Sequence, residues 1–154
     1  PVVATPSVSW LHRVAGPTDE FSQTVMVQAP VGVSEADVVV VDMHAEATSE
    51  KQAMGWYLSG RVAAVIGTHT HVQTNDARVL PGGTAYVTDV GMCGPWDSVI
   101  GVRKDLVIER FLSGRPVSFD PAKREVWLQG AVVDVDEATG LARSIARVQE
   151  RLPD

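Results

Sequence analysis

The chain has 154 residues, 45% of them hydrophobic and 21% charged, which suits one globular domain and excludes disordered, collagen-like and coiled-coil proteins. Its formal net charge of -6 disfavours general binding of nucleic-acid backbones, which needs clustered Lys and Arg, but permits a small anionic substrate beside a bound metal ion. The single cysteine fits a reducing compartment, and no apolar run reaches the roughly 18 residues of a membrane helix, so we expect a cytoplasmic protein.

Residues 1–36 carry the weakest structural signal in the chain. Prolines and glycines interrupt them, and only Thr24–Gln28 has the pattern of a short strand. His12 lies in this segment, and we interpret it as an ordinary loop or surface histidine. We therefore divide the chain into an N-terminal segment, 1–36, and a main domain, 37–150.

The main domain begins with a predicted strand, helix and second strand. Val38–Val41 is an unbroken β-branched run, which is typical of a strand buried on both faces. Ser49–Leu58 predicts a helix that begins at an N-cap of Thr48 or Ser49 and ends at Gly60. Its expected buried stripe is Ala53, Met54 and Tyr57. Arg61–Ile66 predicts a second buried strand, so the whole is a βαβ unit with a right-handed crossover.

The rest of the domain predicts a third apolar strand, a helix and a C-terminal hairpin. The predictions are a turn at Pro81–Gly83, a strand at Thr84–Thr88, a helix at Lys104–Leu112 ended by Gly114, and strands at Val117–Phe119, Glu125–Val135 and Leu141–Val148. A turn at residues 136–140 joins the last two strands into the hairpin. Together these elements indicate an α/β fold.

Three of the four histidines follow the strands of the βαβ unit. His44 follows the first strand, and His69 and His71 follow the second. Ligand groups in such units collect beyond the carboxyl ends of the strands, and residues two apart on an extended segment share one face. Neutral imidazole binds Zn, Fe, Mn, Co or Ni, and phosphoryl hydrolysis commonly uses two such ions about 3.5–4 Å apart. The pattern favours a metal site over hydrogen-bonded structural histidines.

Other polar residues near these strand ends have a functional and a structural interpretation. Four carboxylates lie near the strand ends, Asp42, Glu46, Asp76 and Asp89. Each can be interpreted as an additional metal ligand, as a group that orients an imidazole, or as an ordinary loop residue. Three threonines, Thr48, Thr68 and Thr70, are candidate hydrogen-bond donors to a substrate phosphate. The alternative is a structural role at a helix cap or at the end of a strand. Cys93 has no partner at ligand spacing and is interpreted as a bystander. The loop at Gly91–Trp96 is either a wall of the substrate cleft or a simple turn.

Several blocks of the sequence resemble the bacterial YmdB-like metallophosphoesterase family. The motifs are Asp42-Met43-His44-Ala45-Glu46, Gly55-Trp56-Tyr57-Leu58, Gly67-Thr68-His69-Thr70-His71, Leu80-Pro81-Gly82-Gly83 and Asp97-Ser98-Val99-Ile100-Gly101. The resemblance covers about residues 37–148. The alternative is the wider group of poly-glutamate capsule-synthesis proteins, which share with this sequence only a strand that ends in His-x-His.

The resemblance implies the C-terminal part of a calcineurin-like α/β/β/α metallophosphoesterase sandwich with a dinuclear metal site at one edge. Family members are cyclic-nucleotide phosphodiesterases that typically act on 2′,3′-cyclic nucleotides. By the same resemblance, His44 and His69 are ligands of one metal ion and His71 is a ligand of the other. Iron or manganese is the expected metal.

The sequence also departs from the family pattern. It contains no Gly-Asp, Glu-Asn or Asn-His dipeptide, and in the family these supply the remaining metal ligands and the catalytic acid. We therefore expect the C-terminal half of a longer protein, with one metal ion or none in this chain alone. An exposed sheet edge would favour a homo-oligomer or a complementary chain that supplies the N-terminal half. The alternative function is a non-catalytic truncated module that serves in assembly and has at most residual metal binding.

Overall fold

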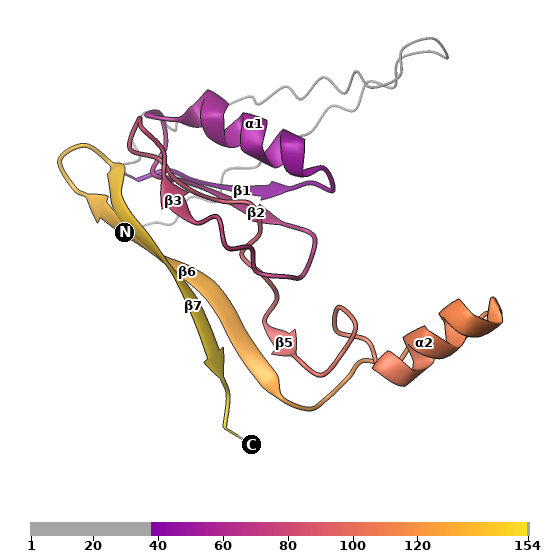
Figure 1. The fold of residues 1–154 in the computed structure, drawn as a ribbon. Coiled ribbons are helices and arrows are strands. Elements are labelled where there is room, and N and C mark those ends of the chain that lie inside the picture. Colours follow the sequence, from indigo (N-terminus) through magenta and orange to yellow (C-terminus); the bar gives the residue numbers. More distant parts are fainter. Residues whose placement is uncertain (1–37, 154) are drawn as a thin grey trace, which may run out of the picture. The chain divides into compact units, whose positions relative to one another are not determined.

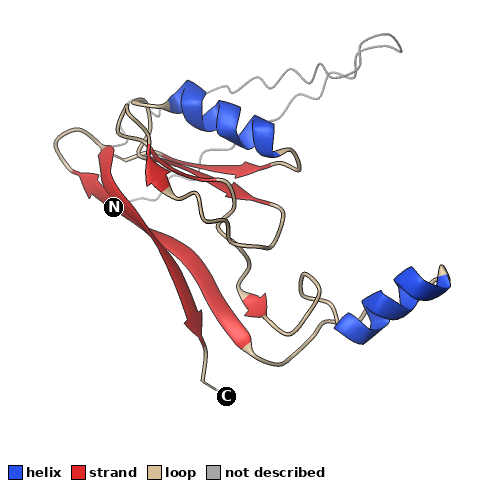
Figure 2. Cartoon of the chain, viewed as in Figure 1, coloured by secondary structure: helices blue, strands red, loops and turns tan. Residues whose placement is uncertain are grey.

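The computed structural model describes residues 38–153, which fold into two helices and two sheets (Figure 1). In chain order the elements are β1 Val40–His44, α1 Thr48–Leu58, β2 Ala64–Thr68, β3 Arg78–Val79, β4 Ala85–Val87, β5 Gly94–Pro95, α2 Lys104–Ser113, β6 Val126–Asp136 and β7 Leu141–Arg151 (Figure 2). The predicted strand at Thr24–Gln28 and His12 lie outside the described residues. Neither α1 nor α2 has the length and apolar character needed to cross a membrane.

The first sheet has the strand order β1-β2-β4-β3. Strands β1, β2 and β4 are parallel, and β3 runs antiparallel to β4. The register pairs Val40 with Ala64 and His44 with Thr68, so β1 and β2 reach their carboxyl ends at the same edge of the sheet. The predicted parallel βαβ unit is confirmed, and α1 crosses one face of the sheet between its two strands (Figure 1).

The second sheet, β5-β6-β7, is built on a long antiparallel hairpin of β6 and β7, as predicted from the turn between them. Strand β7 packs against β3 and β4 of the first sheet. The backbone N–H of Ala142 donates to the carbonyl oxygen of Gly83 at 2.7 Å, which ties the hairpin to the first sheet. The shared core contains Ala64, Ala85 and Ala142, with Ile66, Val79, Val133 and Ile145 packed around them.

Several strands differ from the sequence-based expectations. The strand expected at Arg61–Ile66 begins only at Ala64, because residues 61–63 form a turn and bends. The strand expected at Val117–Phe119 is wrong, since residues 116–120 have no regular structure. Burial of the first strand on both faces is also wrong: Val40 is 49% exposed, and β1 lies at an edge of the described sheet. A β-branched run favours a strand, but its burial depends on which neighbours cover it.

Helix α1 begins and packs differently from its expectation. Its N-cap is Ala47, which has no side chain to cap the helix, and the predicted cap Thr48 is already the first helical residue. The buried positions are Lys51, Met54, Gly55 and Leu58. Ala53 and Tyr57, which were expected on the buried stripe, are exposed. The helix lies so close to the sheet that a Cβ added at Gly55 would be 2.5 Å from the ring of Tyr86.

Candidate functional site

His44 and His69 meet at the carboxyl ends of β1 and β2. His44 is the last residue of β1, and His69 directly follows β2. His69 Nδ1 lies 3.2 Å from His44 Nε2, and the two rings meet edge to face with centroids 5.0 Å apart. Two nitrogen ligands bound to one tetrahedral ion at about 2.0–2.1 Å are themselves about 3.3 Å apart. The spacing of the two nitrogens therefore fits one shared metal ion.

A hydrogen-bonded chain fixes the tautomer of His44. The hydroxyl of Thr68 donates to Asp42 Oδ1 at 3.0 Å, and His44 Nδ1 lies 3.1 Å from that same hydroxyl oxygen. Because the single hydroxyl hydrogen goes to the carboxylate, His44 Nδ1 must carry the proton and donate it. The lone pair on His44 Nε2 then faces His69. Asp42 thus acts through Thr68 to orient the imidazole, which is one of the interpretations that the sequence left open.

His71 makes different contacts from the other two histidines. Its Nδ1 donates to the carbonyl oxygen of Ile100 at 3.1 Å, which leaves Nε2 as the nitrogen with a free lone pair. Within residues 38–153, no three His, Cys, Asp or Glu side chains gather closely enough to hold one ion. The structure therefore brings His44 and His69 together, and ligation of metal by all three histidines stays a prediction.

The backbone around these histidines is strained. His69, with φ of 114°, and His71, with φ of 63°, adopt positive values that favour glycine. Ile100, whose carbonyl accepts from His71, has φ of 47° although it is β-branched. Each such residue costs of order 1–3 kcal/mol, and such strain concentrates at functional sites. The three strained residues mark this loop region as a candidate site independently of residue type.

A buried ion pair holds the histidine loop in place. Lys51 and Asp89 are fully buried, with Lys51 Nζ 3.5 Å from Asp89 Oδ2 and 3.1 Å from the carbonyl oxygen of Thr68. Asp89 accepts the backbone N–H groups of Thr70 at 2.8 Å and Gly91 at 2.9 Å. Burial would raise the pKa of Asp89, but these N–H groups and the Lys51 charge outweigh it and lower the pKa below its ordinary value. Asp89 is thus a structural anchor of the loop.

Asp76 and Glu46 differ from Asp42 and Asp89 in their surroundings. Asp76 accepts the Thr74 hydroxyl at 2.6 Å, the Thr88 hydroxyl at 2.5 Å and the Thr88 backbone N–H at 3.1 Å. Burial opposes the charged form of Asp76, but these hydrogen bonds prevail and lower its pKa. Glu46 is exposed and makes no hydrogen bond or ion pair with another described residue.

The three predicted threonines have different environments. Thr48 is exposed in the first turn of α1. The hydroxyl of Thr68 belongs to the chain that orients His44, and the hydroxyl of Thr70 donates to the carbonyl oxygen of Val72 at 3.2 Å within the loop. Two of the three hydroxyls are therefore already used inside the described part of the chain. Contact of these threonines with a substrate phosphate stays a prediction.

Two residues that support the histidine loop were not predicted from the sequence, namely Lys51 and Gln73. Lys51 lies three residues before Met54 and seven before Leu58, so the helical spacing itself places it on the buried face. Gln73 Nε2 lies 3.0–3.1 Å from three carbonyl oxygens, those of Val90, Gly130 and Val148, and its two hydrogens are shared among them. It joins the end of the histidine loop to the hairpin of the second sheet, and no local pattern could have predicted partners so distant in sequence.

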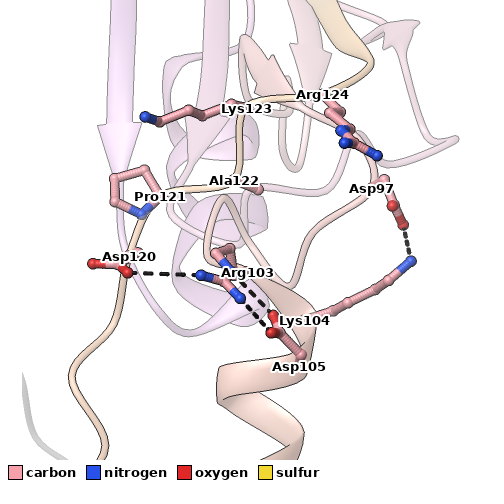
Figure 3. A pocket seen from close by; sticks show the side chains of 9 residues that line it. All are labelled: Asp97, Arg103, Lys104, Asp105, Asp120, Pro121, Ala122, Lys123 and Arg124. Carbon is pink, nitrogen blue, oxygen red and sulfur yellow. Dashed lines mark hydrogen bonds and ion pairs between the residues drawn. The ribbon is translucent and has the colours of Figure 1, made fainter.

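Cavities of the described part of the molecule include one beside His71 and one beside helix α2. One of about 230 Å³ lies beside His71 and is lined in part by Met92, Gly94, Pro95 and Trp96, so the Gly91–Trp96 loop forms a wall of a cleft. The other, of about 730 Å³, surrounds the start of α2 and is lined mainly by charged side chains (Figure 3). Ion pairs of Arg103 and Lys104 with three aspartates neutralise most of those charges, and no histidine lines this second cavity.

Comparisons with known proteins show which family and which solved structures the chain is similar to. Residues 12–148 match the family described as YmdB-like protein. The chain is 53% identical over 110 residues to a Bacillus subtilis (strain 168) protein named 2′,3′-cyclic-nucleotide 2′-phosphodiesterase, a match that covers 71% of this chain and 42% of that protein. A solved structure of a hypothetical protein from Thermus thermophilus has a TM-score of 0.72 and 44% identity, covering 77% of this chain and 46% of that one. A solved phosphatase from Mycoplasma pneumoniae has a TM-score of 0.71 and 35% identity, covering 85% and 50%.

These matches settle fold and ancestry. The mixed α/β fold with a parallel sheet is confirmed, and it is shared with a solved phosphatase and consistent with a calcineurin-like protein. The chain spans about half the length of the relatives that it matches, at 42%, 46% and 50%. The family match includes His44, His69 and His71 and both strands that position them. The chain belongs to the YmdB-like protein family.

Proposed function

We propose that this chain forms part of a metal-dependent phosphodiesterase that hydrolyses 2′,3′-cyclic nucleotides. The observation that carries the proposal is the His44–His69 pair, whose facing nitrogens lie 3.2 Å apart at the carboxyl ends of two parallel strands. The relative from Bacillus subtilis, named for this reaction, supports the substrate class. The single cysteine of the chain agrees with action in the reducing cytoplasm.

His44 and His69 would hold one divalent ion, iron or manganese, and His71 would contribute its free Nε2 to a second. When bound, such ions neutralise phosphoryl charge and make water a stronger nucleophile at neutral pH. Asp42 and Thr68 keep the lone pair of His44 directed toward the first ion, because they fix its tautomer. For His69 to bind as well, the proton of its Nδ1 must move to Nε2.

The chain does not carry a complete ligand set for two ions. Its sequence has no Gly-Asp, Glu-Asn or Asn-His dipeptide, so the bridging carboxylate and the catalytic acid must come from elsewhere. We propose that a complementary chain or segment supplies them, or that a second copy of this chain completes the assembly. Strand β1 offers a place for such pairing, because in the described sheet it pairs only with β2.

The proposal is tested by turnover of 2′,3′-cyclic AMP with added Mn²⁺ or Fe²⁺. The full chain is assayed alone and mixed with the part of the Bacillus subtilis relative that this chain does not match. We expect turnover to require both the metal and the complement, to be abolished by His69→Ala and to survive His12→Ala. Turnover at the level of a protein-free blank in every mixture, with the two parts shown to associate, would make the proposal wrong.

A second candidate, a non-catalytic module that serves in assembly, is favoured by one observation. Within residues 38–153, no three ligand-type side chains gather at one point. Metal analysis of the purified chain separates the two candidates. Two equivalents of iron or manganese, lost in His44→Ala, support the enzyme; no bound metal, together with unchanged assembly of His69→Ala, supports the module, and a single equivalent is decided by whether turnover accompanies it.

A further inference from the structure

The cavity beside His71 has the size and lining of a pocket for one planar ring system. The lining residues that matter here are His71, Met92, Trp96, Ile100 and Gln129. Its volume of about 230 Å³ is below the roughly 300–1,000 Å³ of pockets that enclose a drug-sized ligand. It therefore has room for one ring system, and the rest of a nucleotide would lie outside it, next to His71.

Trp96 gives this cavity an accessible aromatic surface. Its side chain is 53% exposed although its ring packs against Trp127, with centroids 5.1 Å apart and planes inclined by 36°. Met92 and Ile100 add apolar surface around it. A half-exposed indole supported from one side is the kind of surface on which nucleobases stack, and stacking accepts every base because each has a π face.

The loop that carries Trp96 is held by hydrogen bonds on each side of the ring. The backbone N–H of Trp96 donates to the carbonyl oxygen of Glu125 at 2.8 Å. Ser98 Oγ donates to the carbonyl oxygen of Pro95 at 2.5 Å and accepts the N–H of Gly101 at 3.0 Å. The neighbouring Asp97 pairs with Lys104 at the start of α2 (Figure 3). A surface fixed in this way loses little conformational freedom when a ligand binds.

Gln129 adds a polar group that lacks a partner within the described residues. Its side chain is only 7% exposed, and its Oε1 accepts the backbone N–H of Met92 at 2.9 Å. That bond identifies the other end of the amide as the NH₂ group. No described residue accepts from this NH₂ group. Its amide nitrogen has accessible surface, since among the described residues the fully buried polar side-chain atom without a partner is Trp127 Nε1, and so a ring nitrogen or carbonyl oxygen of a base can reach it as an acceptor.

We propose that this cavity binds the nucleobase of the substrate, with Trp96 stacking on the base and Gln129 donating to its edge. The inference rests on the proposed function and deepens it. Because His71 lines the same cavity, a base held there places the attached sugar phosphate within reach of His71, the histidine proposed to hold the second ion. The substrate class is then a nucleoside phosphate, and phosphate esters without a base are poor ligands.

The test compares adenosine 5′-monophosphate with ribose 5-phosphate, which carries a hydroxyl group in place of the base. Both are titrated into the full chain by calorimetry, with chelator present and again with Mn²⁺. We expect the nucleotide to bind roughly 5- to 150-fold more tightly, the range that corresponds to stacking of one base. Trp96→Ala should remove this difference, whereas Trp96→Phe should keep most of it.

Trp56→Ala is the matched control, because Trp56 is 54% exposed on α1 and does not line the cavity. It should bind both probes as the unmodified chain does. If Trp96→Ala does not fold, Trp96→Leu keeps the apolar packing and still removes the ring. Equal binding of the two probes, or unchanged nucleotide binding by the folded Trp96 variant, overturns the inference. Base-dependent binding without any cyclic-nucleotide turnover rejects the proposed function alone, and turnover without base dependence rejects the pocket alone.

Discussion

The Lys51–Asp89 ion pair supports the loop that carries His69 and His71, and its loss has a predictable effect on stability. Both side chains are 0% exposed. Asp89→Ala leaves the ammonium of Lys51 buried without a counter-charge. It also removes the acceptor for the backbone N–H groups of Thr70 and Gly91. The substitution therefore leaves one buried ammonium group and two partly buried N–H groups without their partner.

The expected loss follows from the burial of these groups. Removal of one partner of a buried ion pair typically costs about 3–5 kcal/mol. Each N–H left without an acceptor costs about 1–3 kcal/mol more, although these contributions overlap and do not add fully. We therefore expect Asp89→Ala to lower the free energy of unfolding by at least about 3 kcal/mol. That is a large part of the roughly 5–15 kcal/mol typical of a folded domain.

Urea unfolding at pH 7, followed by circular dichroism, measures this loss. The matched control is Lys104→Ala, which breaks an ion pair whose side chains are 57% and 46% exposed and should cost about 0–1 kcal/mol. Lys51→Met combined with Asp89→Ala should recover part of the stability, because no charge is then left buried. A loss of less than about 1 kcal/mol for Asp89→Ala, equal to that of the control, would refute the reasoning.

The same residue predicts a pH dependence. The pKa of Asp89 is lowered in the folded chain, so its contribution is fully present above the unfolded value of about 3.9. It is lost as the pH falls through the lower folded pKa. The difference in unfolding free energy between the unmodified chain and Asp89→Ala should therefore stay constant from pH 7 to about pH 5 and narrow below about pH 4.

Three further substitutions test other parts of the site. Gly67→Ala should cost at least about 3 kcal/mol or prevent folding, because the added Cβ would lie 1.8 Å from the carbonyl oxygen of Thr88; thermal melting measures it. Thr68→Val should weaken Mn²⁺ binding about 10- to 100-fold in calorimetry with little change in stability, because it breaks the chain that orients His44. Asp76→Asn should destabilise the chain at pH 7 but progressively less below about pH 4 in urea unfolding, because the pKa of Asp76 is lowered.

A control variant or a contradicting outcome can be named for each of these three substitutions. Gly130→Ala should change stability by no more than about 0.5 kcal/mol, since nothing lies within 4 Å of its added Cβ. Thr139→Val, in the turn of the hairpin, should leave Mn²⁺ binding unchanged; equal weakening in both threonine variants would count against the orienting role of Thr68. A stability difference for Asp76→Asn that stays the same from pH 7 to pH 2 would contradict the lowered pKa.

Local signals in the sequence account for most of the described elements. Helix α2 ends at Gly114 as predicted, because Gly114 adopts the left-handed conformation, with φ of 66°, that glycine favours. The hairpin of β6 and β7 follows from two apolar runs and the turn between them. The strands β3 and β5, with two residues each, were missed because they are too short to show any alternation.

The sequence by itself also determined which histidines follow the parallel strands. The carboxyl ends of parallel neighbouring strands lie at the same edge of a sheet, so the order of the strands in the chain was enough to predict that His44 and His69 lie close together, as they do. The family motifs assigned these two residues and His71 to metal binding, and that assignment depends on ancestry and not on the contacts of this chain.

Only the tertiary structure decided how the site is supported and what surrounds it. Lys51 and Asp89 are 38 residues apart in sequence, and Gln73 bonds to a residue 75 positions away. Periodicity and propensity report on neighbours within a few residues, so they cannot show which buried charge meets which carboxylate. The same limit applies to Trp96, since the loop became the wall of a cavity only when the folded chain placed it beside His71 and Gln129.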